Sequence, residues 1–435
     1  MIRQGRRTTR PLRVAAAAAT AALALVAACS RPSATTAASA GAAIDDGPAT
    51  GTVTLWAPSG DANGLDAMLA GFKKANPDAT VQVTIIPSDD YQTKLQTAIA
   101  AGTTPDIAQL YTESQSQVLA SKALAPVPAG LVDKSSFFPA AYAAGEVGGV
   151  AYSVPWYAYS YVLLYRKDFA AKAGVTPPRT WDELVPFLKG LQAGGAVKGI
   201  GYDVGWDRYS GQDLALLAYQ NGSTLLNADR TKWELDTPQV VGAATFLQSL
   251  FTSGVASPDT PGFLDQQPYL VSGKVGSLIT GPWVVSQLDA VAKQPGWTAA
   301  NIGAAVLPAG PAGNYGFVGG GSWGVFAKSK QAASAWKVVK YLSQPSTQVA
   351  QFTAYGSLPA VTAAWKDPAV AGQPLLAPYF TQLEGAKQMP DVSTWTEVAT
   401  AIGKEMEFVA RGKETPEAAM KNVQSRADTI STGAK

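Results

Sequence analysis

Apolar residues follow alternating strand-like and helix-like patterns from residue 52 onward. Residues 52–57 (TVTLWA) and 81–86 (VQVTII) alternate and contain many β-branched side chains, which is typical of strands. Residues 65–75 carry apolar side chains at every third or fourth position, the spacing of one helix face. A second helix is predicted at 91–101 and a third strand at 106–111. This β-α-β-α-β order predicts a parallel sheet covered by helices.

The rest of the chain continues the alternation and then becomes mainly helical. We predict strands at 161–165, 275–280, 304–307 and 323–327, and helices at 181–191, 213–221, 238–253, 283–292, 332–342, 346–355, 394–411 and 415–429. The predicted fold class is therefore α/β.

The first 29 residues have a different pattern. A basic stretch with five arginines is followed by residues 14–28, an uninterrupted run of Ala, Leu, Val and one Thr. This run is shorter than the roughly 20 residues of a membrane span, but it suits the apolar core of an export signal. The only cysteine, Cys29, follows at once, and LVAAC resembles the lipobox of bacterial lipoproteins. We therefore expect a signal peptide at 1–28 and lipidation of Cys29; the alternative is an ordinary signal peptide with a free cysteine.

Residues 29–50 are small and polar, without apolar periodicity. Such composition predicts a disordered tether, which as a coil of about 20 residues spans roughly 25 Å. With a lipid on Cys29, the folded body is expected outside the cytoplasm, anchored to the outer face of the cytoplasmic membrane.

Charge and composition exclude several functions. Five of the 34 basic residues lie in the first 13 positions, so 29 basic and 32 acidic residues remain, a net charge of −3. This balance lacks the positive field that nucleic-acid binding needs. The chain has no histidine and one cysteine, which excludes Ser-His-Asp triads and the usual zinc sites. Gly319-x-Gly321-x-x-Gly324 fits a dinucleotide motif literally, but a predicted strand follows it instead of a helix. We predict no metal and no cofactor.

Several segments occur in the order seen in one family. They are the helix-to-strand step FKKANPDATVQV, the strand entry GTTPDIAQLY, the run YSVPWYAYSYVLLYRKDF with PPRTWDEL, the turn GPW, and GGGSWGVFA with YGSLPA. Together they resemble the extracellular solute-binding proteins of ABC importers, the family of maltose-type and other oligosaccharide-binding proteins. The resemblance covers about residues 52–430.

The resemblance implies a fold of two α/β lobes, the Venus-flytrap fold of periplasmic binding proteins, with a hinge and a ligand cleft between the lobes. Lobe I is expected at 50–157 plus 305–355, and lobe II at 158–304 plus 356–430. The implied function is capture of a sugar, with an oligosaccharide expected, and its delivery to an ABC permease, without catalysis. We expect a monomer.

Candidate ligand-binding residues are aromatic, polar or glycine residues near the ends of predicted strands and in loops. Sugars present apolar faces and hydroxyl groups, so their sites combine aromatic rings with polar side chains. Ligands of open α/β sheets lie at the carboxyl ends of strands. The candidates are Trp56, Ser59, Asp61, Tyr111, Glu113, Trp156, Tyr157, Tyr159, Asp203, Trp206, Asp207, Arg208, Trp283, Gly319, Gly320, Gly321, Tyr355 and Trp395.

By resemblance, Trp283 and Trp395 match stacking aromatics of maltose-type proteins, and the loops of Asp61 and Glu113 match hydroxyl-binding loops. Each aromatic candidate has a plain alternative, because tryptophan and tyrosine are more often part of the core. Trp336, on the apolar face of a predicted helix, is assigned to the core.

Two other functions stay open at this point. A secreted glycoside hydrolase needs two carboxylates about 5–10 Å apart, which Asp61, Glu113, Asp203 and Asp207 could supply. A binding protein for a phosphorylated solute such as glycerol-3-phosphate needs arginine clamps, and only Arg208 lies in a candidate loop. The acidic loops favour a neutral or amino sugar.

Overall fold

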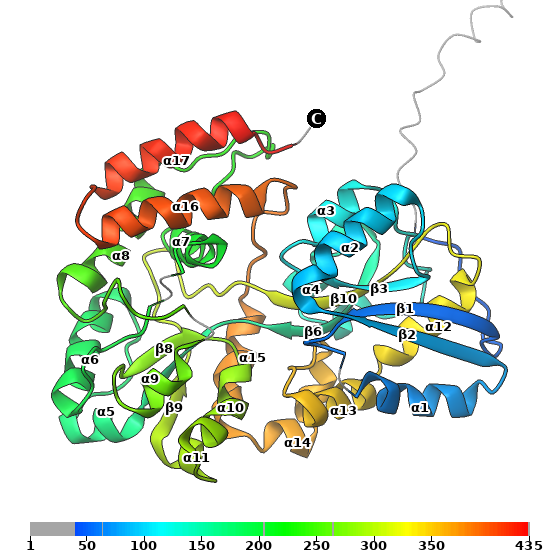
Figure 1. Cartoon of the computed structure of the whole chain (residues 1–435), viewed down its shortest axis with the longest axis horizontal. Helices are drawn as coiled ribbons and strands as arrows, with labels where there is room; N and C mark the ends of the chain where they lie inside the picture. Colours follow the sequence, from blue (N-terminus) through cyan, green and yellow to red (C-terminus); the bar gives the residue numbers. More distant parts are fainter. Residues whose placement is uncertain (1–39, 63, 203–204, 263–264, 434–435) are drawn as a thin grey trace, which may run out of the picture. The chain divides into compact units, whose positions relative to one another are not determined.

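The computed structural model of the chain describes residues 40–433, except 63, 203, 204, 263 and 264 (Figure 1). The predicted signal peptide, Cys29 and the candidate Asp203 lie outside the described residues. Strands and helices alternate and form a mixed α/β fold with two lobes, as expected. No helix in the described part has the length and apolarity that a bilayer crossing requires.

The first lobe contains a five-stranded sheet of order β2-β1-β3-β10-β6. Its strands are β1 (Gly51–Pro58), β2 (Ala79–Ile86), β3 (Ile107–Tyr111), β6 (Ser153–Tyr159) and β10 (Gly319–Val325). The first three pair in parallel, as the β-α-β-α-β pattern predicts, whereas β10 runs antiparallel to both of its neighbours. A strand from late in the chain therefore lies inside a sheet whose other four strands come from residues 51–159.

Helices cover this sheet because each has one apolar face. In α1 (Leu65–Ala75) the four residues at the predicted helical spacing are buried: Leu65, Met68, Leu69 and Phe72. The other helices of this lobe are α2 (Ser88–Ala101), α3 (Gln115–Ala120), α4 (Pro139–Ala143), α12 (Ala332–Leu342) and α13 (Pro345–Tyr355). In the core beside them, Trp156 and Trp323 are fully buried with ring centroids 4.4 Å apart.

The second lobe has a smaller sheet of order β8-β7-β9. Its strands β7 (Val162–Arg166), β8 (Ser277–Thr280) and β9 (Ile302–Ala305) pair antiparallel. The surrounding helices are α5 (Lys167–Ala173), α6 (Trp181–Gly194), α7 (Arg208–Gln220), α8 (Pro238–Thr252), α9 (Gln267–Val271), α10 (Trp283–Ala292), α11 (Trp297–Asn301), α16 (Trp395–Ala410) and α17 (Pro416–Ile430). Figure 1 shows α16 and α17 side by side above α7.

The chain passes between the lobes more than once. Only two residues separate β6 from β7, and residues 306–318 connect β9 with β10. After α13, the residues that the resemblance assigns to lobe II first pack against lobe I: Leu358 O accepts from Ala158 N, and the Val361 N–H donates to Gln348 in α13. Later, α14 (Pro368–Ala371) and α15 (Ala377–Glu384) lead to α16.

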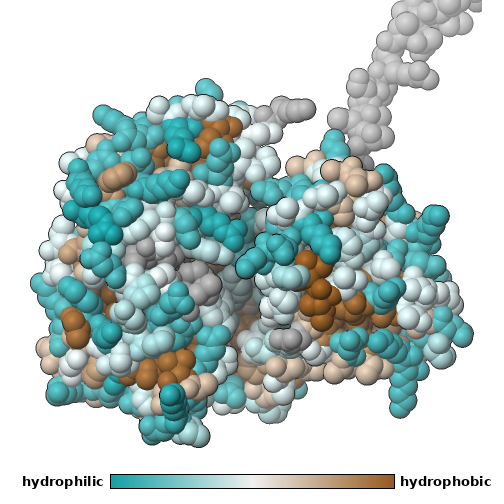
Figure 2. All heavy atoms as spheres, viewed as in Figure 1, coloured by the Kyte–Doolittle hydropathy of each residue, from teal (hydrophilic) through white to brown (hydrophobic). Residues whose placement is uncertain are grey.

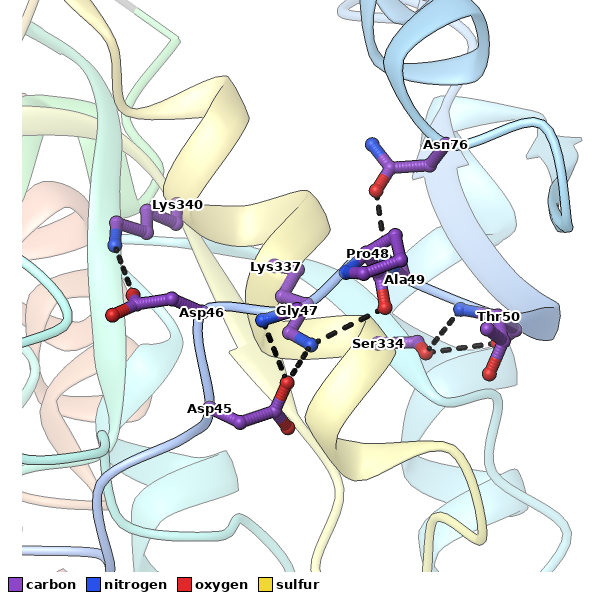
Figure 3. A network of polar contacts seen from close by, with 10 residues as sticks. All are labelled: Asp45, Asp46, Gly47, Pro48, Ala49, Thr50, Asn76, Ser334, Lys337 and Lys340. Carbon is purple, nitrogen blue, oxygen red and sulfur yellow. Dashed lines mark hydrogen bonds and ion pairs between the residues drawn. The ribbon is translucent and has the colours of Figure 1, made fainter.

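Residues 40–50, here called the docked segment, lie against lobe I (Figure 3). Ala49 is fully buried, and its N–H donates to Oδ1 of Asn76 at 2.8 Å. The backbone of Thr50 exchanges two hydrogen bonds with the Ser334 hydroxyl of α12, at 3.1 and 2.8 Å. The part of the predicted tether at 40–50 is therefore packed against the body.

Two ion pairs and a short β-bridge hold the docked segment further upstream. Asp45 lies 2.8 Å from Nζ of Lys337, and Asp46 lies 4.0 Å from Nζ of Lys340, both on α12 (Figure 3). The backbone of Gly41 pairs with the loop at 127–129 through two hydrogen bonds. The exposed ion pairs add little energy, so the buried Ala49 and the backbone bonds carry most of this attachment.

The surface has few large apolar side chains outside these contacts. Figure 2 shows a hydrophobic patch near the edge strand β2, where Ile85 is 53% exposed. The other large exposed apolar residues of the described part are Val147, Val197 and Phe408. Nearly all large apolar side chains are thus used for packing.

Candidate functional site

Asp61, in the loop after β1, accepts hydrogen bonds from several side chains of the first-lobe sheet. Nε2 of Gln109 lies 2.5 Å and the Tyr157 hydroxyl 2.9 Å from its Oδ2 atom, and the Tyr111 hydroxyl is a third donor. Burial raises the pKa of Asp61, and the three donors partly oppose this shift. Side chains of strands β3 and β6 thus hold the Asp61 carboxylate in place.

Glu113, in the loop after β3, forms a second centre of the same kind. Its Oε1 atom accepts from the Tyr159 hydroxyl at 2.9 Å. Burial raises the pKa of the Glu113 carboxyl, while the bond from Tyr159 and the charge of Arg208 lower it. Arg208 begins α7 of the second lobe, so groups from both lobes act on this carboxyl.

A small pocket joins the lobes beside Glu113. It is lined by Glu113 of lobe I and by Arg208, Tyr209, Gln212 and Trp395 of lobe II. The Arg208 guanidinium donates to the Tyr209 hydroxyl at 2.6 Å. The predicted α7 loop and the start of α16 are therefore brought together with the β3 loop, although they lie far apart in the sequence.

Trp283 contributes an aromatic surface from the second lobe. It begins α10 directly after β8, Gly281 and Pro282, which is the predicted position at the carboxyl end of a strand. A Cβ on Gly281 would lie 1.9 Å from the Trp283 ring, so glycine is required for the ring to fold back over this turn. The ring packs edge-on against Tyr159, with centroids 5.1 Å apart.

Other candidates lie at the margin of this region. Tyr355 ends α13, and its ring lies close to Gly64 beyond Asp61. Trp56 is half-buried with Lys94 above its ring, and Ser59 is exposed and bonds to Ser88.

The structure places some candidates in supporting positions rather than toward a ligand. Trp156 is fully buried against Trp323. Trp206 packs against Phe251, and Asp207 caps α7 by accepting from the Tyr209 N–H at 2.8 Å. Trp395 is 4% exposed and packs against Trp233, although it also lines the small pocket.

The glycine run corrects a predicted boundary. The strand expected at 323–327 is β10, Gly319–Val325, so Gly319, Gly320 and Gly321 lie inside a central strand and are buried. They form no loop against which a ligand could lie.

Two polar residues of the site were not among the candidates. Gln109 is fully buried in β3 and donates to Asp61; Gln212 is buried on α7 beside Glu113 and Trp395. The signal for Gln109 is a polar residue inside the otherwise apolar strand IAQLY. Gln212 has no comparable signal, because α7 contains several polar residues.

Several buried polar atoms around the two carboxylates have no hydrogen-bond partner within the described residues. They are Oε2 of Glu113, Oε1 of Gln109 and the hydroxyl of Tyr355. A buried polar atom left unpaired costs about 1–3 kcal/mol. These atoms are therefore suited to a ligand that brings hydroxyl groups.

A larger cavity of about 920 Å³ lies between α10 and α13. Its lining includes Pro282 and Val285 on one side and Phe352 and Tyr355 on the other. It therefore borders Tyr355 and the start of α10, and it offers room for a ligand longer than one ring. Within the described residues no cluster of acidic or cysteine side chains is arranged to hold a metal ion.

Comparisons with known proteins agree with this geometry. The family model for the bacterial extracellular solute-binding protein matches residues 56–349. A putative binding protein of Brucella abortus is 30% identical, covering 82% of this chain and 87% of the relative.

Solved structures match over most of the chain. The sugar-binding protein MalE of Xanthomonas citri has a TM-score of 0.81 and 28% identity, covering 87% of this chain and 97% of its own. The GacH receptor of Streptomyces glaucescens, solved without ligand and with acarbose, has a TM-score of 0.76 and 25% identity, covering 89% and 100%.

Proposed function

This chain belongs to the family of bacterial extracellular solute-binding proteins of ABC transporters, and we propose that its ligand is a sugar, specifically an oligosaccharide. The ligand is captured outside the cytoplasmic membrane and delivered to the permease. The sugar-binding MalE of Xanthomonas citri and the acarbose-binding GacH receptor support this class of ligand.

One observation carries the proposal. Glu113 Oε2 and Gln109 Oε1 are buried acceptors without partners in the part of the chain that the structure describes. Glu113 is bonded to Tyr159 of the Tyr159–Trp283 aromatic pair, and Gln109 is bonded to Asp61. Ring hydroxyls of a sugar donate to such acceptors, while its apolar face packs on an aromatic ring. The cavity of about 920 Å³ between α10 and α13 supports a ligand of more than one sugar unit.

The charges favour a neutral or amino sugar over a phosphorylated solute. Arg208 is the arginine that lines the small pocket, and it already donates to Tyr209 and lies near Glu113. A phosphate group would meet the carboxylates of Asp61 and Glu113 without a free bidentate clamp.

The alternative of a glycoside hydrolase is addressed by a simple assay. Asp61 and Glu113 both belong to lobe I, and each is fixed by phenol donors. We propose that they bind hydroxyl groups and catalyse nothing. Incubation with oligosaccharides should give saturable binding without products, and turnover would identify an enzyme.

The ligand class is tested by a thermal-shift screen of residues 40–435 against mono-, di- and trisaccharides and glycerol-3-phosphate. Ligand-specific stabilisation follows directly from binding. An oligosaccharide should raise the melting temperature most, and stabilisation by glycerol-3-phosphate alone would overturn the proposal. We also propose that the protein is a monomer, held at the membrane by a lipid on Cys29.

A further inference from the structure

Three consecutive glycines occupy the centre of the first-lobe sheet. Strand β10 lies between β3 and β6, and Gly319, Gly320 and Gly321 are all buried there. Glycine weakens a strand interior because it has no side chain to pack and a high entropy cost. Three in a row in a central strand therefore call for a physical reason.

Gly319 and Gly321 lie directly beneath two tyrosine rings of the neighbouring strand. The register pairs Gly319 with Tyr159 and Gly321 with Tyr157. A Cβ on Gly319 would lie 2.4 Å from Cζ and 2.7 Å from the hydroxyl oxygen of Tyr159. A Cβ on Gly321 would lie 2.6 Å from Cε1 of Tyr157 and 3.1 Å from Nε2 of Gln109. Any side chain at either position would displace a ring or this amide.

The two positions open the same face of the sheet, because alternate residues of a strand point to the same side. At these two positions β10 contributes no side chain to this face, whereas Trp323, two residues further along the strand, packs against Trp156. The rings of Tyr157 and Tyr159 lie against these two glycines, and their hydroxyls reach Asp61 and Glu113 at 2.9 Å each. Each glycine is thus next to a phenol that donates to one carboxylate.

We propose that Gly319 and Gly321 are positioning residues of the ligand site. Because they have no side chains, the rings of Tyr159 and Tyr157 can lie close to strand β10, where their hydroxyls orient Glu113 and Asp61 for the ligand. They act through these tyrosines and do not contact the ligand. The inference rests on the proposed function for its binding readout only, because the positions of the phenols are measurable without a ligand.

Gly320 has a different reason to be glycine. Its φ is 135°, and a Cβ there would lie 2.2 Å from the backbone oxygen of Tyr157. Substitution would disturb the strand pairing itself. Gly320 is therefore left out of the test.

Gly324 offers a matched control on the same strand. A Cβ there would meet the side-chain ends of Leu110 at 2.9 Å and Leu124 at 3.0 Å, in a separate apolar cluster. Gly324→Ala should lower the melting temperature through crowding and leave sugar affinity within about twofold. This variant measures how crowding in β10 changes stability and affinity when no tyrosine ring is displaced.

The first arm of the experiment needs no ligand. Crystal structures of Gly319→Ala and Gly321→Ala should show the Tyr159–Glu113 or Tyr157–Asp61 hydrogen bond broken. If Gly319→Ala alone does not fold, Tyr159→Ala is added to remove the clash. Recovered folding supports the proposal, whereas a double variant that still fails to fold would show a backbone requirement and overturn it.

The second arm is a double-mutant cycle by calorimetry, with maltotriose as the probe sugar. Gly319→Ala and Tyr159→Phe should each weaken binding about tenfold, as expected for the loss of a hydrogen bond to a charged group. Their combination should be no more than about twofold worse than either alone, because both remove the same bond. Effects that multiply would mean that Gly319 acts independently of Tyr159, and the proposal would be rejected.

The two arms separate this inference from the proposed function. Broken phenol bonds together with no binding of maltotriose by the unaltered protein would count against the choice of ligand and still support the positioning role. Unchanged phenol positions would overturn the positioning role whatever the ligand.

Discussion

The Tyr159 hydroxyl donates to Oε1 of Glu113 over 2.9 Å, and it ties the strand that leaves the first lobe to the loop after β3. One carboxylate oxygen is thereby fixed, while Oε2 has no partner among the described residues. Part of the site is thus ordered before a ligand arrives, which lowers the entropy cost of binding.

Trp283→Ala should weaken sugar binding about 30-fold or more while the protein stays folded. The ring is partly buried, packs edge-on against Tyr159 and begins α10 at the carboxyl end of β8. Truncation of a hot-spot aromatic typically costs about 2 kcal/mol or more. Titration calorimetry and thermal melts on the same sample measure both effects.

The control for Trp283 is Trp336→Ala. Trp336 is a residue of α12, and its side chain is 3% exposed in the core. Its loss should lower the melting temperature and leave the affinity of the folded fraction nearly unchanged. Normal binding by folded Trp283→Ala protein, with a lowered melting temperature, would instead place Trp283 in the core.

Asp61→Asn should stabilise the ligand-free protein at pH 7 and weaken sugar binding. Burial raises the pKa of Asp61 above its ordinary value of 3.8. Between the ordinary and the raised pKa, the folded state binds more protons than the unfolded state, so stability falls as pH rises. The charged Asp61 therefore costs stability above its raised pKa, and asparagine removes that cost.

Melting curves of both proteins at pH 4 and pH 7 check this sign. The advantage of Asp61→Asn should be larger at pH 7. Equal differences at the two pH values would show that ionisation of Asp61 is not responsible.

Sugar affinity should fall as the solution is acidified through the raised pKa values of Asp61 and Glu113. Ligand hydroxyls donate to the ionised carboxylates, and a protonated carboxyl loses acceptor capacity. Calorimetric titrations from pH 7 down to pH 4 measure the trend. An affinity that does not change over this range would argue that the carboxylates do not contact the ligand.

Ligand binding should reduce the radius of gyration. Two lobes with facing polar groups imply that a ligand bridging them shifts the population toward a closed form. Small-angle scattering with and without saturating sugar tests this, and identical curves would indicate a rigid binder.

Cys29→Ala should release the protein from membrane fractions. Cys29 is the only thiol in the chain, and it follows the predicted signal directly. Cell fractionation and immunoblotting provide the measurement. Full retention of the variant in membranes would exclude lipidation of Cys29 as the anchor.

Local patterns predicted much of the fold because they act within one element. The spacing of Leu65, Met68, Leu69 and Phe72 identified the buried face of α1, and the GPW turn after a strand located Trp283. Strand pairing was harder to predict, because no local sequence pattern indicates that β10 inserts between β3 and β6.

The same limit applies within the site. Strand β6 is covered on both faces, so every residue from Ser153 to Ala158 is buried, and alternation cannot separate Trp156 from Tyr157. Only the partners distinguish them: Trp156 meets Trp323 in the core, whereas Tyr157 reaches Asp61. The docked segment was missed because its partners on α12 lie more than 280 residues away.

The docked segment also changes the reach of the protein at a membrane. With a lipid on Cys29, the tether that the sequence predicts would end at Ala40 instead of Thr50. A coil of about 11 residues spans roughly 18 Å, compared with roughly 25 Å for a coil of about 20 residues. The volume that the body explores shrinks with the cube of this length, to about 40%. Its local concentration near a permease in the same membrane rises about 2.5-fold. Because the attachments are to Asn76, the loop at 127–129 and α12, all in the first lobe, this gain does not restrain the second lobe.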